Sequence, residues 1–242
     1  MSDVRKQPGL LRSYLELCRA SNLPTVWTNA LAATLLSGAL RPTLSSLAAG
    51  LSVTLTYLGG MALNDVLDVA EDRLKKPSRP IPSGRIPVAH AAAFALGLFA
   101  AGLLLLGLFC PVPALQAGLA LLAVVYLYDR LHQQSWLTVL LMAGCRALVF
   151  VVCGFGAAGT LTRLAALGAA LQFSYIVALT AVARWEKQAP RSFKVPPVPW
   201  MIACVSLLDG AMLALWVHPA WLLAGLLGVG VTRAAQTQVR GD

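Results

Sequence analysis

Residues 44–73 read LSSLAAGLSVTLTYLGGMALNDVLDVAEDR, an apolar segment that ends in four of the chain's ten acidic residues. An apolar helix of ~20 residues is long enough to cross a lipid bilayer. If residues 43–74 form one helix, Asp65, Asp68 and Asp72 lie at positions i, i+3 and i+7 and point to one side. Negative charge is unfavourable at the C-terminal end of a helix. We therefore expect a cation here, supplied by nearby basic side chains or by a divalent metal.

The composition indicates an integral membrane protein with a single domain over residues 1–242. Of the 242 residues, 58% are hydrophobic and 12% are charged, and the mean hydropathy is +0.72. These values exclude a soluble domain of this length. We expect an all-α membrane bundle of about eight transmembrane helices. The expected spans are Pro24–Leu40, Leu44–Asn64, Val88–Cys110, Pro113–Leu131, Trp136–Phe155, Leu161–Val182, Val198–Val217 and the short Pro219–Thr232.

The positive charges are distributed unequally between the loops. With eight spans and the N-terminus inside, sixteen of the nineteen Lys and Arg residues fall on the inner side. Arg41 and Arg163 fall outside, and Arg146 lies within the fifth span. Because cytoplasmic loops hold the excess of Lys and Arg, this distribution predicts cytoplasmic termini and a cytoplasmic acidic cluster. We expect the membrane to be a bacterial inner membrane. The net charge of +9 then reflects topology and attraction to anionic lipid head groups, and no nucleic-acid partner is expected.

Three polar residues within the expected spans are candidates for a function. Asn29 is expected either to hydrogen-bond a neighbouring helix or to line a cavity, because an amide at this depth normally faces the bundle interior. Placing an arginine such as Arg146 within a membrane span costs a few kcal/mol, so its side chain should face a partner or a water-filled cavity. Asp209, in the seventh span, is expected to pair with a basic residue or to take a proton.

The five cysteines form no Cys-x-x-Cys pair, and we interpret them as small buried hydrophobic residues.

The loop of residues 73–87 is basic and contains four prolines. Proline fixes the backbone φ angle, so the loop is expected to be stiff. A stiff basic loop beside an acidic helix end suits an anion that is held through a metal. The alternative is an ordinary positively charged cytoplasmic loop, which would need no acidic residues beside it.

These residues resemble the UbiA superfamily of intramembrane prenyltransferases. The motif Asn-Asp-x-x-Asp-x-x-x-Asp is matched by Asn64, Asp65, Asp68 and Asp72, with Arg73 and Arg79-Pro80 downstream. The resemblance extends from Leu17 through the sixth span. It implies a bundle of nine helices whose two acidic motifs bind Mg²⁺ and, through it, the diphosphate of a polyprenyl donor. The prenyl tail would lie in a channel that is open to lipid, and a small acceptor, with aromatic compounds among the candidates, would receive the isoprenoid.

The resemblance also implies roles for individual residues. Asp65, Asp68 and Asp72 would hold Mg²⁺ and act in catalysis. Arg184 would supply the positive charge that a second metal supplies elsewhere, and Glu186 would position that arginine or take a proton from the acceptor. Substrate-binding roles are expected for Asn29, Asn64, Arg73, Arg79, Arg130, His132 and Arg146.

The chain departs from the family pattern at three points. The second acidic cluster is reduced to Glu186 beside Arg184, and Arg130 and His132 stand where a lysine is often found. A ninth span is also lacking. The pieces Ala183-Arg184-x-Glu186, Tyr128-Asp129 and Gly144-Cys145-Arg146 look most like a UbiA-like branch called EboC.

Two other functions remain open from the sequence. The reduced second motif is also typical of a non-catalytic protein that binds or carries an isoprenoid. A proton- or ion-coupled transporter that uses Asp209 and Arg146 is the third hypothesis.

Overall fold

The fold is that of a helical bundle. The computed structural model describes residues 9–131, 138–188 and 197–239, and these residues form helices and no strand. The α-helices are α1 (Leu10–Leu17), α2 (Leu23–Leu36), α3 (Leu44–Leu67), α4 (Val69–Lys75), α5 (Val88–Phe109), α6 (Val112–Leu131), α7 (Thr138–Ala158), α8 (Arg163–Gln188), α9 (Pro197–Trp216) and α10 (Trp221–Gln238). A short 3₁₀ helix, η1 (Ala20–Asn22), precedes α2. The predicted all-α class is confirmed.

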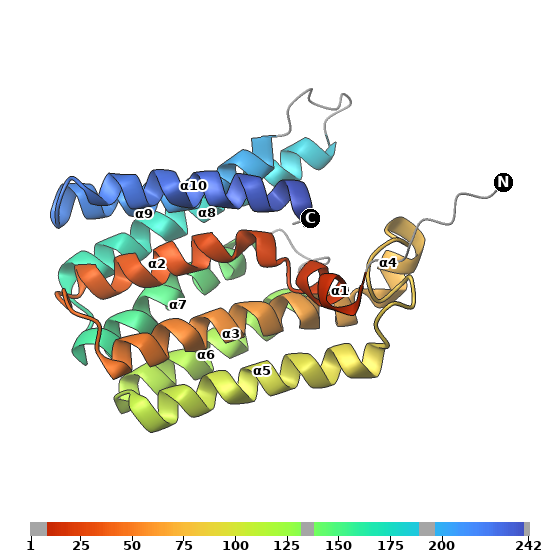
Figure 1. The fold of residues 1–242 in the computed structure, drawn as a ribbon, viewed down its shortest axis with the longest axis horizontal. Helices are drawn as coiled ribbons and strands as arrows, with labels where there is room; N and C mark the ends of the chain where they lie inside the picture. Colours follow the sequence, from red (N-terminus) through yellow and green to blue (C-terminus); the bar gives the residue numbers. More distant parts are fainter. Residues whose placement is uncertain (1–8, 132–137, 189–196, 240–242) are drawn as a thin grey trace.

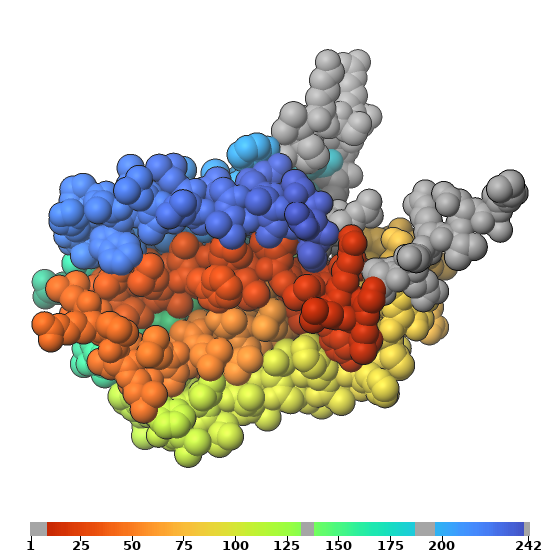
Figure 2. All heavy atoms as spheres, viewed as in Figure 1, coloured from red at the N-terminus to blue at the C-terminus, as the bar shows by residue number. Residues whose placement is uncertain are grey.

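The eight longer helices are arranged in two layers. Figure 1 shows α10, α2, α3 and α5 side by side, with α9, α8, α7 and α6 behind them. Helices that follow one another in the chain pack together, and α10 packs against both α9 and α2. The short helices α1 and α4 lie together at one end of the bundle, beside the end of α3 (Figure 1). Figure 2 shows the same end in spheres, with α1 packed against the front layer.

Each expected span coincides with one of these helices, but only six of them are long and apolar enough to cross a membrane: α3, α5, α6, α7, α8 and α9. Helix α2 has 14 residues. At ~1.5 Å per residue it measures about 21 Å, less than a hydrocarbon core of ~30 Å. Helix α10 is not among the six either. Six such helices fit an integral membrane protein, and the count of eight spans stays a prediction.

The prediction of one helix over residues 43–74 is wrong, because the helix is interrupted at Asp68. Helix α3 begins with a capping box between Thr43 and Ser46 and ends at Leu67, and α4 begins at Val69. The interruption places Glu71 and Asp72 in the first turn of α4 instead of the last turn of a longer helix. The positive end of the helix dipole stabilises acidic side chains in a first turn, which gives a physical reason for the break.

A small hydrophobic cluster fixes the proline-containing loop to the bundle. Ile81 and Ile86 are buried together with Leu17 of α1, Ala62 of α3 and Ala91 of α5. The loop backbone is also held by hydrogen bonds, among them Ile86 N to Pro80 O at 3.1 Å. The loop and α1 are therefore packed beside the end of α3, where the acidic motif lies.

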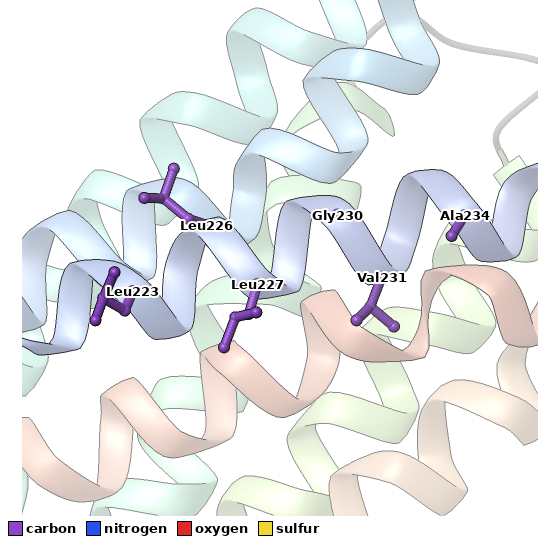
Figure 3. Close-up of a pocket in the computed structure, with 6 residues that line it drawn as sticks. All are labelled: Leu223, Leu226, Leu227, Gly230, Val231 and Ala234. Carbon is purple, nitrogen blue, oxygen red and sulfur yellow. The ribbon is translucent and has the colours of Figure 1, made fainter.

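The outer side of α10 carries an apolar groove of about 430 Å³. Its lining consists of Leu223, Leu226, Leu227, Gly230, Val231 and Ala234. Figure 3 shows that they come from successive turns of this one helix. In an integral membrane protein, lipid chains cover an exposed apolar face of this kind, so the groove needs no protein partner.

Candidate functional site

Two carboxylates of the acidic motif converge on one arginine. Asp65 of α3 and Asp72 of α4 are 3% and 6% exposed. Arg79, in the loop after α4, donates from Nη1 to Asp65 Oδ1 at 3.2 Å and to Asp72 Oδ2 at 2.5 Å. The break at Asp68 does not separate these two carboxylates. Arg79 thus lies between the end of α3 and the start of α4 and supplies a positive charge that the sequence led us to expect.

A second arginine reaches the same cluster from the N-terminal side. Arg19 donates from Nη2 to Asn64 Oδ1 and to Asp65 Oδ1, both at 3.2 Å. Its carbonyl oxygen accepts a hydrogen bond from the Tyr57 hydroxyl at 3.2 Å. The motif does not predict Arg19 as a site residue, because 45 positions separate it from Asn64. The sequence signal is limited to its place just before the first expected span, Pro24–Leu40.

Asn64 connects the cluster to α6. Its amide Nδ2 donates to Asp129 Oδ1 at 3.2 Å, while its Oδ1 faces Arg19. Asp129 is 5% exposed and lies in the last turn of α6. The sequence showed Asp129 only as part of a family-like piece beside Tyr128. The structure therefore adds Arg19 and Asp129 to the cluster, and we call Arg19, Asn64, Asp65, Asp72, Arg79 and Asp129 the acidic site.

The remaining predicted residues near this end of the bundle have varied environments. Asp68 is half-buried at the helix break, and Arg73 is exposed on α4. Arg130 is exposed, donates from Nε to the Tyr126 hydroxyl at 3.1 Å and lies over the Tyr126 ring. Their predicted substrate roles are not tested by these contacts. His132 lies outside the described residues.

Arg184 and Glu186 lie near the end of α8, and both are half-buried. Arg184 donates from Nη2 to Thr138 Oγ1, at the start of α7, at 2.9 Å. Tyr128 of α6 lies within electrostatic range of both Arg19 and Arg184. The contact of Arg184 is thus with the start of α7, and the roles predicted for Arg184 and Glu186 stay predictions.

Asn29 and Arg146 meet in a second polar cluster in the middle of the bundle. Arg146 of α7 donates to Asn29 Oδ1 at 2.9 Å and to Thr25 Oγ1 at 2.9 Å. The Asn29 amide donates to both carboxylate oxygens of Asp209, at 2.8 and 2.7 Å. Gln172 Nε2 donates to Asp209 Oδ1 at 2.7 Å. Of the two expectations for Asn29, hydrogen bonding to neighbouring helices is the one observed, and its amide stands between Arg146 and Asp209.

The acidic site fits a magnesium ion that arrives with a phosphate group. Among the described residues, no three His, Cys, Asp or Glu side chains group closely enough to hold a metal by themselves. Mg²⁺ prefers oxygen ligands and is commonly bound by one or two carboxylates together with waters and substrate phosphates. Asp65 and Asp72 supply such a pair of carboxylates. The donor set therefore suits a shared site for a metal and a phosphate group better than a cage made of protein alone.

The chain belongs to the UbiA prenyltransferase family, whose sequence pattern matches residues 22–239. The family resemblance seen in the sequence is therefore confirmed. A digeranylgeranylglyceryl phosphate synthase of Sulfolobus acidocaldarius is 35% identical over 119 residues, which cover 49% of this chain and 42% of the relative. The synthase of Ignicoccus hospitalis is 42% identical over 97 residues, which cover 40% and 31%. The matched region thus spans less than half of these relatives.

Two solved structures have the same fold. A structure of digeranylgeranylglyceryl phosphate synthase superposes with a TM-score of 0.62 and 20% identity, and the match covers 94% of each chain. A UbiA homologue from Archaeoglobus fulgidus, solved with GPP and Mg²⁺, gives a TM-score of 0.60 and 18% identity over 93% of this chain and 86% of that one. At these identities the likeness shows the fold alone. None of these relatives tests the narrower EboC-like resemblance, which stays a prediction.

Proposed function

We propose that this protein is a Mg²⁺-dependent prenyltransferase that moves an isoprenoid from a polyprenyl diphosphate to a small acceptor. The observation that carries the proposal is the buried pair of Asp65 and Asp72 around Arg79, at one end of a UbiA-family bundle. The names of the relatives and the GPP and Mg²⁺ bound to a structural neighbour support it. In the topology proposed from the charges, the protein lies in a bacterial inner membrane with both termini and the acidic site on the cytoplasmic side.

The chemistry requires a site that stabilises a leaving diphosphate. A nucleophile of the acceptor attacks the allylic carbon, the bond from that carbon to oxygen breaks, and negative charge develops on the diphosphate. Mg²⁺ would be held by the carboxylates of Asp65 and Asp72, with Asp68 as a third ligand that moves in when metal and diphosphate bind, and it would supply charge neutralisation at that oxygen. Arg19 and Arg79 carry planar guanidinium groups next to the same carboxylates, and such groups bind phosphate oxygens bidentately.

The other residues are assigned around this centre. Asn64 is held between Arg19 and Asp129, which fixes the direction of its amide oxygen. Arg184 adds positive charge from α8, and Glu186 positions it or takes the proton that the acceptor releases. We assign Arg73, Arg130 and His132 to the diphosphate side. Asn29 and Arg146 are bonded to each other and, through Asn29, to Asp209, so the substrate roles proposed for these two residues would require them to exchange those hydrogen bonds for contacts with the acceptor or the prenyl chain.

A non-catalytic isoprenoid carrier is the second candidate. The observation that favours it is the end of α8, where Glu186 is the one acidic residue among the described positions and Arg184 bonds to Thr138. A carrier would bind the prenyl diphosphate and leave its carbon–oxygen bond intact. A transporter that depends on Asp209 would instead move a solute irrespective of Asp65 and Asp68.

The decisive experiment measures diphosphate release and prenylated products. Purified protein in lipid nanodiscs is given prenyl diphosphate, Mg²⁺ and an extract of cell lipids and small metabolites as the source of the acceptor. Lipids from expressing cells are compared by mass spectrometry. Asp68→Ala should lower release by at least about 100-fold, since loss of transition-state charge stabilisation has effects of that size. Glu71→Gln is the matched control, because Glu71 bonds to Lys75 on α4 and not to the acidic site. Release by Asp68→Ala at the wild-type rate would rule out the metal role, and binding without any product would favour the carrier.

A further inference from the structure

Arg79 is held more tightly than a surface arginine. The Arg79 side chain is 13% exposed, and those of its partners Asp65 and Asp72 are 4% and 8% exposed. One nitrogen, Nη1, contacts both carboxylates. Buried carboxylates require a partner charge, and removing one member of such a group leaves an uncompensated charge. Arg79 therefore already occupies the position between the two acids where an oxygen-binding cation would be most stable.

A divalent metal and Arg79 cannot both use these oxygens. Like charges repel strongly at separations of a few ångströms when the surroundings are poor in water. A metal that binds to Asp65 and Asp72 must therefore displace the guanidinium. The displaced guanidinium then needs new hydrogen-bond acceptors, because a buried charge without partners raises the free energy of the folded protein. The phosphate oxygens of a donor bound through the same metal are suitable acceptors.

The loop geometry confines this exchange to the Arg79 side chain. The Arg79 backbone is fixed on both sides, by Arg79 N to Lys76 O at 3.1 Å and Ser83 N to Arg79 O at 3.0 Å. The next residues, Pro80 and Ile81, are buried. Arg19 also contacts Asp65 Oδ1, but its second acceptor is the neutral Asn64 Oδ1, so it keeps a partner in the acidic site when a metal takes the Asp65 oxygen.

We propose that Arg79 is an exchangeable counter-ion, which competes with free Mg²⁺ for Asp65 and Asp72 and moves to the phosphate oxygens when metal and prenyl diphosphate bind together. This inference rests on the proposed function. It predicts that metal and diphosphate bind cooperatively and that the metal alone binds weakly. It also predicts that Arg79 weakens the binding of the metal alone and strengthens the binding of the diphosphate.

The test measures these two affinities separately in nanodiscs. Binding of Mn²⁺, used as the probe for Mg²⁺, is followed by electron paramagnetic resonance without prenyl ligand. Binding of a prenyl thiolodiphosphate, which is not cleaved, is followed by calorimetry at saturating Mg²⁺. Arg79→Gln should tighten Mn²⁺ binding on the order of 10-fold and weaken binding of the thiolodiphosphate by a similar factor, a usual size for coupling between sites.

Three further variants make the result specific. Lys75→Gln removes one positive charge from α4, where Lys75 pairs with Glu71, and should leave both affinities unchanged. Arg79→Lys keeps the charge and should bind Mn²⁺ about as weakly as the wild type. Asp65→Asn should abolish Mn²⁺ binding. Thermal unfolding of Arg79→Gln with and without Mn²⁺ adds a readout of folding, since a ligand that binds the native state should raise its melting temperature.

The possible results separate this inference from the proposed function. If Mn²⁺ binding depends on Asp65 but is equal or weaker in Arg79→Gln, Arg79 does not compete with the metal and the inference fails alone. If neither the wild type nor Arg79→Gln binds Mn²⁺ or the thiolodiphosphate, the proposed function and the inference both fail. Opposite changes of the two affinities in Arg79→Gln, with Lys75→Gln unchanged, would support both.

Discussion

Arg19 adopts a backbone conformation that its residue type seldom shows. Its φ and ψ of 46° and 47° lie in the left-handed region, and it is the one non-glycine residue with positive φ among the described positions. Such a residue costs about 1–3 kcal/mol and persists where surrounding contacts hold it. Those contacts are the hydrogen bonds to Asn64 and Asp65 and the bond from Tyr57 to its carbonyl oxygen. The turn between α1 and η1 thus directs Arg19 into the acidic site.

Cys18, next to Arg19, should react slowly with thiol reagents. It is 5% exposed, and burial, with a further contribution from the charge of Asp65, raises its pKa from 9.0 to about 12. The thiolate is the reactive form. At pH 8 we expect alkylation by iodoacetamide to be about 100-fold slower than at an exposed cysteine, even after allowing for the greater nucleophilicity of a high-pKa thiolate. Mass spectrometry of the labelled peptides measures the rates.

The matched reference is Leu11→Cys, because Leu11 is 75% exposed on α1, the helix that ends next to Cys18. The Cys18 rate should rise with pH up to about 12. The pKa of the Cys18 thiol is higher in the folded state than in the unfolded state, so this thiol loses its proton first in the unfolded state. Stability is therefore unaffected below pH ~9 and falls between pH ~9 and ~12, by up to about 1.4 kcal/mol per unit. Equal rates at Cys18 and Leu11→Cys would contradict the burial of this thiol.

At the scale of elements, the break at Asp68 shows what helical periodicity misses. The spacing of Asp65 and Asp72 suggests one continuous helix, and both side chains do reach Arg79. Periodicity carries no information about the cost of acidic residues at a helix end. The chain reduces that cost by starting α4 at Val69, so that Asp72 lies in a first turn. The motif could be predicted, but the helix boundary inside it could not.

The contact between α9 and α10 depends on two glycines. A Cβ atom added at Gly225 would lie 2.8 Å from the carbonyl oxygen of Ser206 and 2.9 Å from the Cα of Gly210. Both are backbone atoms, so the helices would have to move apart. We expect Gly225→Ala to lower the free energy of unfolding by about 1–3 kcal/mol, the usual cost of overpacking. Thermal unfolding followed by circular dichroism measures the change.

Gly230 provides the control on the same helix. It faces the groove of Figure 3, and a Cβ atom added there would meet nothing within 4 Å. Gly230→Ala should be neutral or stabilising, by up to about 1 kcal/mol, because alanine favours helices more than glycine does. If both variants lost the same stability, close packing of α9 and α10 would not be the reason.

At the scale of the whole molecule, the second polar cluster joins four helices. Asn29 of α2, Arg146 of α7, Gln172 of α8 and Asp209 of α9 form one chain of hydrogen bonds. Polar groups inside a membrane protein are stable when they satisfy one another in this way. The cluster therefore fixes how α2 lies against the rear layer, and through α2 it bears on the position of Arg19.

The sequence predicted the helical segments and the Asn64–Asp72 motif because both depend on neighbouring residues. It did not predict that Arg19 contacts Asn64, that Asn64 contacts Asp129, or that Asn29 contacts Asp209. These pairs are 45, 65 and 180 residues apart in the chain. Which polar residues meet across such distances depends on helix packing and rotation, and these are not encoded in local spacing. The orientation of the bundle in the membrane is predicted only from the distribution of Lys and Arg residues between the loops.

That orientation can be tested with two introduced cysteines. Leu40, between α2 and α3, is 69% exposed, and Leu74, at the end of α4, is 86% exposed. The charge distribution places Leu74 in the cytoplasm and Leu40 outside. In spheroplasts, a maleimide that does not cross membranes should label Leu40→Cys at once and Leu74→Cys only after permeabilisation, with the wild type as the background. The reverse pattern would place the acidic site on the outer face, where a prenyl diphosphate made in the cytoplasm could not reach it directly.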